Sequence, residues 1–371
     1  MTEKSKLHEL SAQGVSVWID SISREWLAEG FLAKLIRDHA VVGVTSNPTI
    51  FQKSLAGPGW YDEQLREVLR EETDPKEIFY RLAVQDIQDA CDVLRAVWDG
   101  GGGEDGYVSM EVDPTLAHDR QATIDEALRL HEWIDRPNLL VKIPATEPGL
   151  GAIEECIAQG RSINVTLIFS LDRYTAVAEA YVRGLERLVE AGGDPSTVAS
   201  VASFFVSRVD SEADKRLEAI GTDEALALRG KLAVANAKLA YRRYGEVFSG
   251  PRWEALAAKG ATPQRCLWAS TSTKNPDYPD TLYVDELIGP ETVNTMPLDT
   301  VEAFQDHGTV ARTLDSGLDE AERVLAELER VGVDYDDVTD TLEREGVQKF
   351  ADSFEELLDG IRAKRSELTA A

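Results

Sequence analysis

NLLVKIP, residues 138 to 144, is a short apolar run that carries one charged side chain. Alternate residues of a β-strand point to opposite faces, so Leu139, Val141 and Ile143 share one face while Lys142 lies on the other. This pattern predicts a buried strand whose single lysine points into the interior of the fold.

Similar short segments recur along the chain, with amphipathic stretches between them. The other strand candidates are SVWID (16–20), VVGVTSN (41–47), YVSMEVD (107–113), INVTLIF (163–169), SVASFFVSR (200–208), CLWAS (266–270) and, more weakly, ETVNTMP (291–297). Helical patterns lie between them at 24–40, 75–98, 120–133, 150–159 and 171–191. This alternation predicts an α/β fold, a single (β/α)₈ TIM barrel; without the eighth strand, an open doubly wound sheet is the alternative.

The domain organisation follows from the absence of a linker. No Pro/Gly/Ser-rich break divides the chain, and the glycines at 100–103 form only a loop, so we expect one domain over residues 1–371. Residues 315–371 are expected to be a helical C-terminal extension that packs on the barrel, because Val347, Phe350 and Phe354 repeat at helical spacing. Periodicity alone favours docking on the outer wall of the barrel over covering its mouth.

Composition and charge exclude several classes of protein. Lys and Arg number 39 against 67 Asp and Glu, giving a formal charge of −28 in 371 residues, which would repel nucleic acid and anionic membranes. An anionic substrate would need a local cluster of positive side chains. Neither a signal peptide nor an apolar run of about 20 residues is present, so we expect a cytoplasmic protein without a membrane partner.

Cysteine and histidine usage argues against a metal or redox centre. The three cysteines are far apart in the sequence, and the five histidines form no HExxH motif or i, i+4 pair. We therefore expect no metal and no cofactor.

Polar residues interrupt the inward faces of several predicted strands. Glu111 faces the same way as Lys142, and Asn164, Thr166 and Ile168 face inward on the fifth strand. A lysine in such a place loses hydration, which favours the neutral amine that attacks carbonyls; the alternative is a lysine at a strand end that extends to solvent.

Two more polar residues lie where strands end, Asp20 after the first and Asn47 after the second. Active sites of (β/α)₈ barrels lie at the carboxyl ends of the strands, so these side chains and Lys142 are expected to share one Schiff-base pocket. Arg208 and Lys274, after the sixth and seventh strands, are candidates for binding a phosphate, although each alone is more typical of a surface charge.

The strand motifs resemble one known family. VTSNPTIF (44–51) and LLVKIPATEPGLGAIEE (139–155) resemble the two signature segments of transaldolases. Further similar segments are YVSMEVDPTLAHD (107–119), SINVTLIFSLDRY (162–174), SFFVSRVD (203–210) and LWASTSTKNPDY (267–278). The resemblance runs from about Trp18 to the C-terminal helix.

The resemblance implies a transferase of the pentose phosphate pathway. Such an enzyme moves a dihydroxyacetone unit from sedoheptulose 7-phosphate to glyceraldehyde 3-phosphate, which gives erythrose 4-phosphate and fructose 6-phosphate. Lys142 would form the Schiff base, and Asp20 would be the base for carbon–carbon bond cleavage. Glu111 would shuttle protons with a water held by Thr166.

The same resemblance implies a set of substrate-binding residues. They are Asn47, Asn164, Ser203, Phe205, Arg208 and Ser270. One departure from the family is Ser272, which stands where many transaldolases have a second phosphate-binding arginine. Lys274 is the candidate that would supply the missing charge, as a point charge without the bidentate geometry of arginine.

Two other functions remain open from sequence. One is a Schiff-base aldolase that releases free dihydroxyacetone or cleaves a deoxyribose phosphate; the other is a non-catalytic barrel that binds sugar phosphates or a protein. We expect a monomer or a homodimer.

Overall fold

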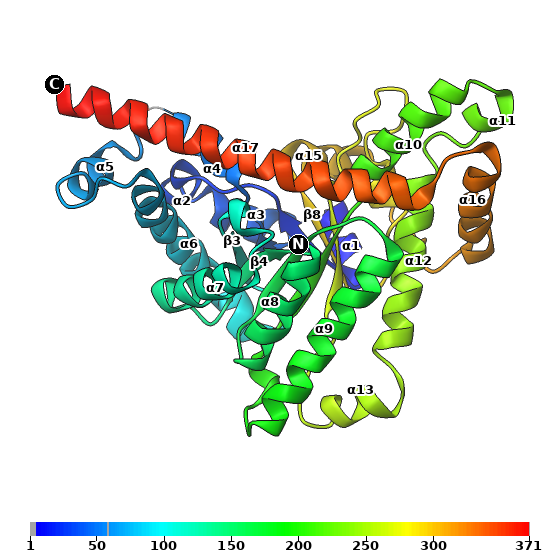
Figure 1. Cartoon of the computed structure of the whole chain (residues 1–371), viewed down its shortest axis with the longest axis horizontal. Coiled ribbons are helices and arrows are strands. Elements are labelled where there is room, and N and C mark those ends of the chain that lie inside the picture. The colour runs from blue at the N-terminus through cyan, green and yellow to red at the C-terminus, as the bar shows by residue number, and fades with distance from the viewer. Residues whose placement is uncertain (1–4, 58, 371) are drawn as a thin grey trace.

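A computed structural model describes residues 5–57 and 59–370 (Figure 1). Met1 to Lys4, Pro58 and Ala371, which belong to the expected single domain, lie outside the described residues. Eight strands form the centre of the molecule and helices surround them. The strands are β1 (Val15–Ile19), β2 (Val41–Val44), β3 (Tyr107–Glu111), β4 (Leu139–Pro144), β5 (Ile163–Ile168), β6 (Ser200–Phe205), β7 (Arg265–Ala269) and β8 (Thr292–Met296).

The strands form a closed parallel barrel in sequence order. β8, the weakest candidate in the sequence, pairs with both β7 and β1 and closes the barrel. The predicted (β/α)₈ fold is therefore confirmed, and the open doubly wound sheet is wrong. All strand residues except Val42 are buried, which agrees with apolar runs covered on both faces.

The helices lie between and around the strands in the following order. They are α1 (Lys6–Ala12), α2 (Arg24–Ala28), α3 (Phe31–His39), α4 (Pro48–Ala56), α5 (Asp62–Val68), α6 (Pro75–Gly100), α7 (Arg120–Ile134), α8 (Glu147–Ala158), α9 (Leu171–Glu190), α10 (Ser207–Ile220), α11 (Asp223–Leu226), α12 (Leu232–Val247), α13 (Gly250–Ala257), α14 (Leu282–Asp285), α15 (Leu298–His307), α16 (Leu318–Val331) and α17 (Tyr335–Ala370). Two short 3₁₀ helices are η1 (Pro114–Leu116) and η2 (Pro195–Thr197).

The first predicted helix, 24–40, is two helices in the structure. Gly30 separates α2 from α3 with a φ of 71°, a left-handed conformation that glycine adopts at little cost. Apolar periodicity alone did not reveal this break, because apolar residues of both helices pack against the core: Leu27, which is partly buried, on α2, and Leu32 and Leu35 on α3.

β5 departs from regular alternation near its carboxyl end. Leu167 has a φ of 59°, and the register with β6 shifts between Val165 and Ile168. Ile168 pairs with Phe204, whose ring contacts Tyr174 of α9 outside the barrel, so the inward placement expected for Ile168 is wrong. The irregularity is a bulge-like kink, which strict period-two counting cannot include.

α17 crosses the barrel at the carboxyl ends of the strands and contacts α4, α6, α10 and β5 (Figure 1). The side chains of Phe350, Phe354 and Ile361 are buried on one face of this helix, as the spacing predicted. Docking on the outer wall, the arrangement that periodicity favoured, is therefore wrong, and the helix forms part of the mouth instead.

The opposite end of the barrel is closed by the loop between α6 and β3. Asp105 accepts hydrogen bonds from Ser16 at 2.7 Å and Trp18 at 3.3 Å, and Arg265 donates to it at 3.0 Å. Gly106 has a φ of 90°, and an added Cβ would lie 2.5 Å from the backbone nitrogen of Trp98, so this turn requires glycine. The centre of the barrel is thus filled at its base by this loop and its hydrogen bonds.

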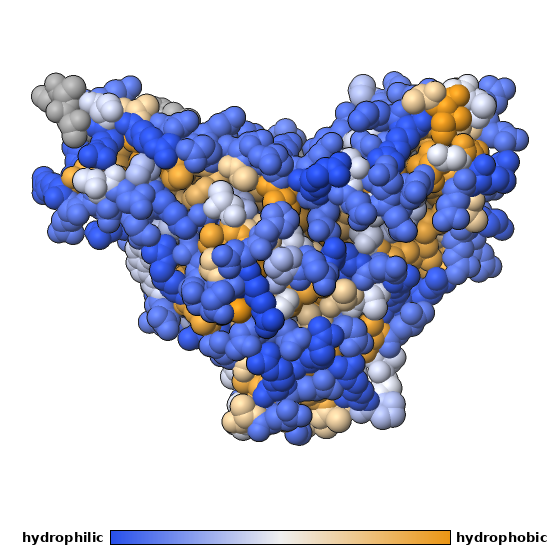
Figure 2. All heavy atoms as spheres, in the orientation of Figure 1, coloured by the Kyte–Doolittle hydropathy of each residue, from blue (hydrophilic) through white to orange (hydrophobic). Residues whose placement is uncertain are grey.

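Figure 2 shows a face made mostly of hydrophilic residues, as the charge balance leads one to expect. No helix in the described ranges combines the length and the apolar character that crossing a bilayer requires.

Candidate active site

A cavity of about 280 Å³ opens at the carboxyl ends of the strands. Nine of the eleven residues expected in the site line it: Lys142, Asp20, Thr166, Asn47, Ser203, Phe205, Arg208, Ser270 and Lys274. Glu111 and Asn164 do not line this cavity but contact residues that do, as described below. The expectation of a shared pocket therefore agrees with the geometry.

Lys142 lies at the bottom of the cavity with only 5% of its surface exposed. Its Nζ donates a hydrogen bond of 2.9 Å to the carbonyl oxygen of Ser46, which precedes α4. The same nitrogen lies 3.4 Å from Oε2 of Glu111. The register places Glu111 of β3 and Asn164 of β5 directly beside Lys142 of β4, so the pairing of three neighbouring strands assembles this cluster.

Glu111 has an environment suited to exchanging a proton with Lys142. Burial raises the pKa of its carboxyl group, and the nearby Lys142 partly offsets this rise. Its Oε2 atom accepts no hydrogen bond from the described residues, nor does the buried hydroxyl of Thr166 have a partner among them. Buried polar atoms without partners are uncommon, so both atoms are available to a substrate or a water.

Asp20 lies on the other side of the cavity, after β1. Its Oδ1 accepts a 2.6 Å hydrogen bond from the hydroxyl of Thr45, whose oxygen is in turn 2.6 Å from the hydroxyl of Thr295. Burial raises the pKa of Asp20, while the Thr45 bond and the positive charge of Lys142 lower it. The carboxyl group is therefore held by one short bond in a poorly hydrated place.

Amide side chains form the polar wall between these groups. Asn164 donates to the hydroxyl of Ser109 at 3.0 Å and accepts from Ser203 at 2.7 Å, so its orientation is fixed. Asn47 is the N-cap of α4, and its Oδ1 accepts from the backbone of Ile50 at 3.0 Å. This leaves the amide nitrogen of Asn47 to donate toward the cavity.

The outer part of the cavity is positively charged. The guanidinium of Arg208 lies 4.9 Å from the ring centre of Phe205 and 5.8 Å from that of Phe350. Burial lowers the pKa of Arg208, and burial followed by the charge of Arg208 lowers the pKa of Lys274. Lys274 also donates a hydrogen bond to Ser272. Two cations so close that the charge of Arg208 lowers the pKa of Lys274 form a place where an anion is stabilised.

Ser270 follows β7 with a φ of 56°, a conformation that is uncommon for residues other than glycine. Its hydroxyl lies 3.0 Å from that of Ser207, at the start of α10. Strained backbone of this kind is concentrated at functional sites, and here it points the serine toward the cavity.

Sequence reasoning did not place several residues of the cavity, among them Thr45, Thr295, Lys53 and Lys349. Thr45 was noted only as part of a polar strand end, and Thr295 lies in the strand with the weakest pattern. Lys53 and Lys349 lie on helices α4 and α17 and have no signal in a strand pattern. Only the packing of α17 across the mouth brings Lys349 to the cavity.

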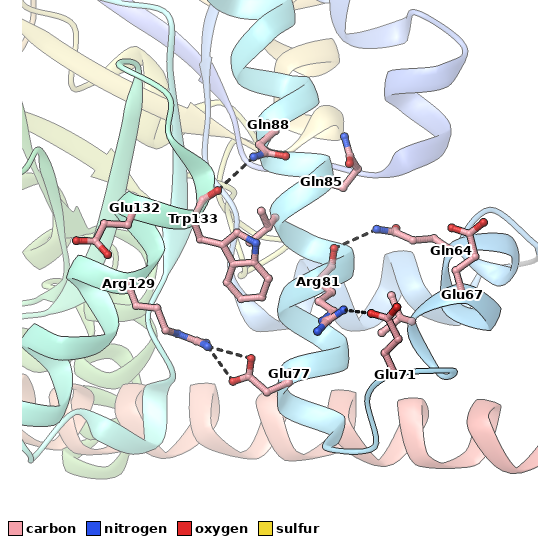
Figure 3. Close-up of a pocket in the computed structure, with 12 residues that line it drawn as sticks. Gln64, Glu67, Glu71, Glu77, Arg81, Gln85, Gln88, Arg129, Glu132 and Trp133 are labelled. Atoms are coloured by element: carbon pink, nitrogen blue, oxygen red, sulfur yellow. Dashed lines mark hydrogen bonds and ion pairs between the residues drawn. The ribbon is translucent and has the colours of Figure 1, made fainter.

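A larger hollow of about 870 Å³ lies between α5, α6 and α7, and Lys142 is not among the residues that line it (Figure 3). In it, Arg129 bonds both carboxylate oxygens of Glu77 at 2.9 Å, and Arg81 contacts Glu71 at 3.4 Å. Its charged groups thus pair with one another on an open surface. We place the chemistry in the smaller cavity, because it holds the buried Lys142 together with Asp20, and Glu111 lies 3.4 Å from the lysine.

The fold and the cavity together define a class: a (β/α)₈-barrel enzyme with a buried lysine at the carboxyl ends of its strands. Residues 17–361 match the model of the transaldolase/fructose-6-phosphate aldolase family. The chain belongs to this family.

Several relatives are similar over nearly their whole length. A transaldolase of Frankia alni is 59% identical over 356 residues, which cover 96% of each chain. One of Acidothermus cellulolyticus is 59% identical over 96% of this chain and 95% of its own. One of Mycobacterium ulcerans is 52% identical over 99% of both. These proteins are named transaldolases, and none of the three is named an aldolase.

Proposed function

We propose that this chain is a transaldolase of the pentose phosphate pathway, a transferase that acts through a Schiff base on Lys142. The observation that carries this proposal is the buried Lys142, 3.4 Å from Glu111, in a cavity that also holds Asp20 and a group of cations. The transaldolases of 52–59% identity support the same activity.

The first half of the reaction transfers a three-carbon unit to the enzyme. Lys142 Nζ adds to the C2 carbonyl of sedoheptulose 7-phosphate, and loss of water gives a protonated imine. Asp20 removes the proton of the C4 hydroxyl, and the electrons of the C3–C4 bond move into the imine. Erythrose 4-phosphate leaves as the aldehyde, and a dihydroxyacetone enamine remains on Lys142.

Proton transfer around the nitrogen is the proposed task of Glu111. Loss of water from the carbinolamine requires a proton donor, and hydrolysis at the end of the cycle requires a base. The raised pKa of the buried Glu111 and its contact with Lys142 Nζ support both uses. A water held between Thr166 and Glu111 would link the carboxyl group to the substrate oxygen. That position is supported by the buried Thr166 hydroxyl and Glu111 Oε2, neither of which has a hydrogen-bond partner among the described residues.

The second half reverses the bond changes on another aldehyde. The enamine carbon attacks the carbonyl of glyceraldehyde 3-phosphate, and Asp20 returns its proton to the new C4 oxygen. Hydrolysis of the imine then releases fructose 6-phosphate and frees Lys142. No metal or cofactor is needed in this scheme, because the protonated imine is the electron sink.

The remaining residues hold the substrate. Asn47 and Asn164 would bind the hydroxyls of the dihydroxyacetone unit, with Ser203 fixing Asn164 through their 2.7 Å bond. Ser270 and Phe205 would contact the sugar. Arg208 and Lys274 would bind the phosphate, as the positive outer part of the cavity supports.

Transfer and simple cleavage differ in the fate of the enamine. The matched family includes fructose-6-phosphate aldolases, which makes cleavage with release of dihydroxyacetone the natural competitor. Incubation with fructose 6-phosphate, with and without erythrose 4-phosphate, distinguishes them. Without the acceptor we expect at most one glyceraldehyde 3-phosphate per enzyme, released as Lys142 takes up the three-carbon unit. With the acceptor we expect continuous release, in step with sedoheptulose 7-phosphate.

Other outcomes of that assay have clear meanings. Free dihydroxyacetone formed at a comparable rate without acceptor would establish the aldolase activity instead. Absence of turnover, with sugar-phosphate binding that survives Lys142→Ala, would establish the binding protein.

We further propose that the barrel and residues 315–371 act as one domain, which the packing of α17 against α4, α6 and α10 supports. The cavity is formed by one chain, so a monomer or a homodimer would be active. A cytoplasmic location is supported by Cys91, Cys156 and Cys266, which are all buried thiols without disulfides.

A further inference from the structure

The charge balance of the cavity is opposite to that of the chain. The protein has 67 acidic and 39 basic residues, yet among the residues that line the cavity the only carboxylate is Asp20. Five of the lining residues are cations: Lys53, Lys142, Arg208, Lys274 and Lys349. Like charges gathered in one place repel each other, so this arrangement favours an anionic ligand with more than one positive contact.

Lys349 is the member of this group that comes from α17. It is exposed and lines the cavity, and it forms no ion pair or hydrogen bond with the described residues. Other cations of the same helix behave differently: Arg362 pairs with Glu355 at 2.7 Å and Lys364 with Asp62 at 3.2 Å. This chain has many carboxylates, yet Lys349 lies beside a cavity without a carboxylate partner among the described residues. An anionic ligand in the cavity would supply that partner.

The residue after Lys349 ties the helix to Arg208. The guanidinium of Arg208 lies between the rings of Phe205 and Phe350, and it forms no ion pair with the described carboxylates. The positive charge of Lys349 also contributes to lowering the pKa of Lys274. Lys349 therefore acts electrostatically on the same region as Arg208 and Lys274.

We propose that Lys349 of α17 binds the phosphate group of the substrate together with Arg208 and Lys274, so that the C-terminal helix is part of the phosphate site. Arg208 is the inner, largely buried contact, whereas Lys274 and Lys349 are exposed at the entrance. A phosphate has three terminal oxygens and relieves the repulsion among these cations when it binds. This inference rests on the proposed function in taking the ligand to be a sugar phosphate.

The test compares Lys349→Ala with Lys349→Arg, which keeps the charge, and with Lys259→Ala as a control. Lys259 is an exposed lysine just after α13, and α13 lies at the opposite end of the molecule from α17 (Figure 1). Binding of inorganic phosphate is measured by calorimetry at low ionic strength. We expect Lys349→Ala to weaken it about three- to tenfold, with little change in Lys349→Arg and Lys259→Ala.

Kinetics supply a second readout that a purely structural role would not change. The ratio of kcat/KM for glyceraldehyde 3-phosphate to kcat/KM for glyceraldehyde should fall about three- to tenfold in Lys349→Ala. Unchanged phosphate affinity, or an unchanged ratio because both acceptors lose equally, would overturn the inference. Calorimetry reads phosphate binding even if the chain shows no turnover, so failure of this inference is distinguishable from failure of the proposed function.

Discussion

Asp20 and Glu111 are two buried carboxyl groups that flank one lysine but have different neighbours. Glu111 contacts Lys142 at 3.4 Å and accepts no hydrogen bond at Oε2 among the described residues, whereas Asp20 accepts a short bond from Thr45. Burial raises the pKa of both. The hydrogen bond to Thr45 stabilises the ionised form of Asp20, the form that a base for bond cleavage requires.

The pH profile tests the role of Thr45. Because Asp20 must be ionised to act, activity is lost as pH falls through its pKa, which burial has raised. Thr45→Val removes the donor that lowers this pKa, so the acidic limb of kcat/KM should move to higher pH. Well above that limb, we expect kcat/KM to fall by less than about tenfold.

A matched control separates this effect from loss of stability. Thr123 is also buried, and its hydroxyl donates to the carbonyl oxygen of Leu116, away from Asp20. Thr123→Val should leave the position of the acidic limb unchanged. A Thr45→Val profile that overlays the parent profile would show that Asp20 is not the group that titrates.

How much of the site was predictable depends on which element carries each residue. Lys142, Glu111 and Thr166 were predictable because strand alternation and barrel closure together determine which side chains converge. Thr45 was passed over because a threonine after an apolar strand is common, and its bond to Asp20 depends on how β1 and β2 pair. Lys349 was out of reach, because helical periodicity does not say which surface a helix covers.

At the scale of elements, α17 is the segment whose placement matters most for the site. Phe354 is 3% exposed, and its ring packs edge-to-face on Phe79 of α6 at 5.6 Å. Phe79 in turn packs on Phe51 of α4 at 5.4 Å. This aromatic cluster holds α17 across the mouth, so Lys349 and Phe350 reach the cavity only while it is intact.

Truncating the member of that cluster that lies on α17 should release the helix. Phe354→Ala removes a buried ring and leaves a cavity, at a cost of about 3–5 kcal/mol in the free energy of unfolding. Relative to the parent protein, we expect amide hydrogen exchange to rise more in residues 347–361 than in the strands. We also expect a lower kcat/KM for phosphorylated substrates. Mass spectrometry measures the exchange, and denaturant unfolding measures the change in the free energy of unfolding.

Phe304→Ala is the comparison for this experiment, because Phe304 is a fully buried phenylalanine on α15, outside the aromatic cluster of α17. It should lower global stability without selectively raising exchange in 347–361. Equal exchange patterns in the two variants would contradict the view that the aromatic cluster anchors α17.

The elements themselves were mostly predictable, since all eight strands lie within or next to the segments expected to form them. The errors are local and have backbone causes. Gly30 divides one predicted helix into two through its positive φ, and Leu167 turns the end of β5 away from regular alternation. Neither backbone conformation can be predicted from the spacing of hydrophobic residues, which is the signal that the sequence analysis used.

At the scale of the whole molecule, the residues that stabilise the barrel and the residues proposed to react lie at opposite ends of it. The base is filled by Asp105, Arg265 and their hydrogen bonds, while the carboxyl ends of the strands hold the buried lysine and carboxylates. A formal charge of −28 surrounds a cavity with five cations, so an anionic substrate finds its favourable place only inside the mouth.

The central claim is that Lys142 carries the three-carbon unit between donor and acceptor. The most direct measurement is borohydride reduction after incubation with fructose 6-phosphate, followed by intact-mass analysis and peptide mapping. We predict one reduced three-carbon adduct on Lys142, removed by a prior chase with erythrose 4-phosphate and absent from Lys142→Arg. A folded protein that stays unmodified, or an adduct on another lysine, would contradict the account.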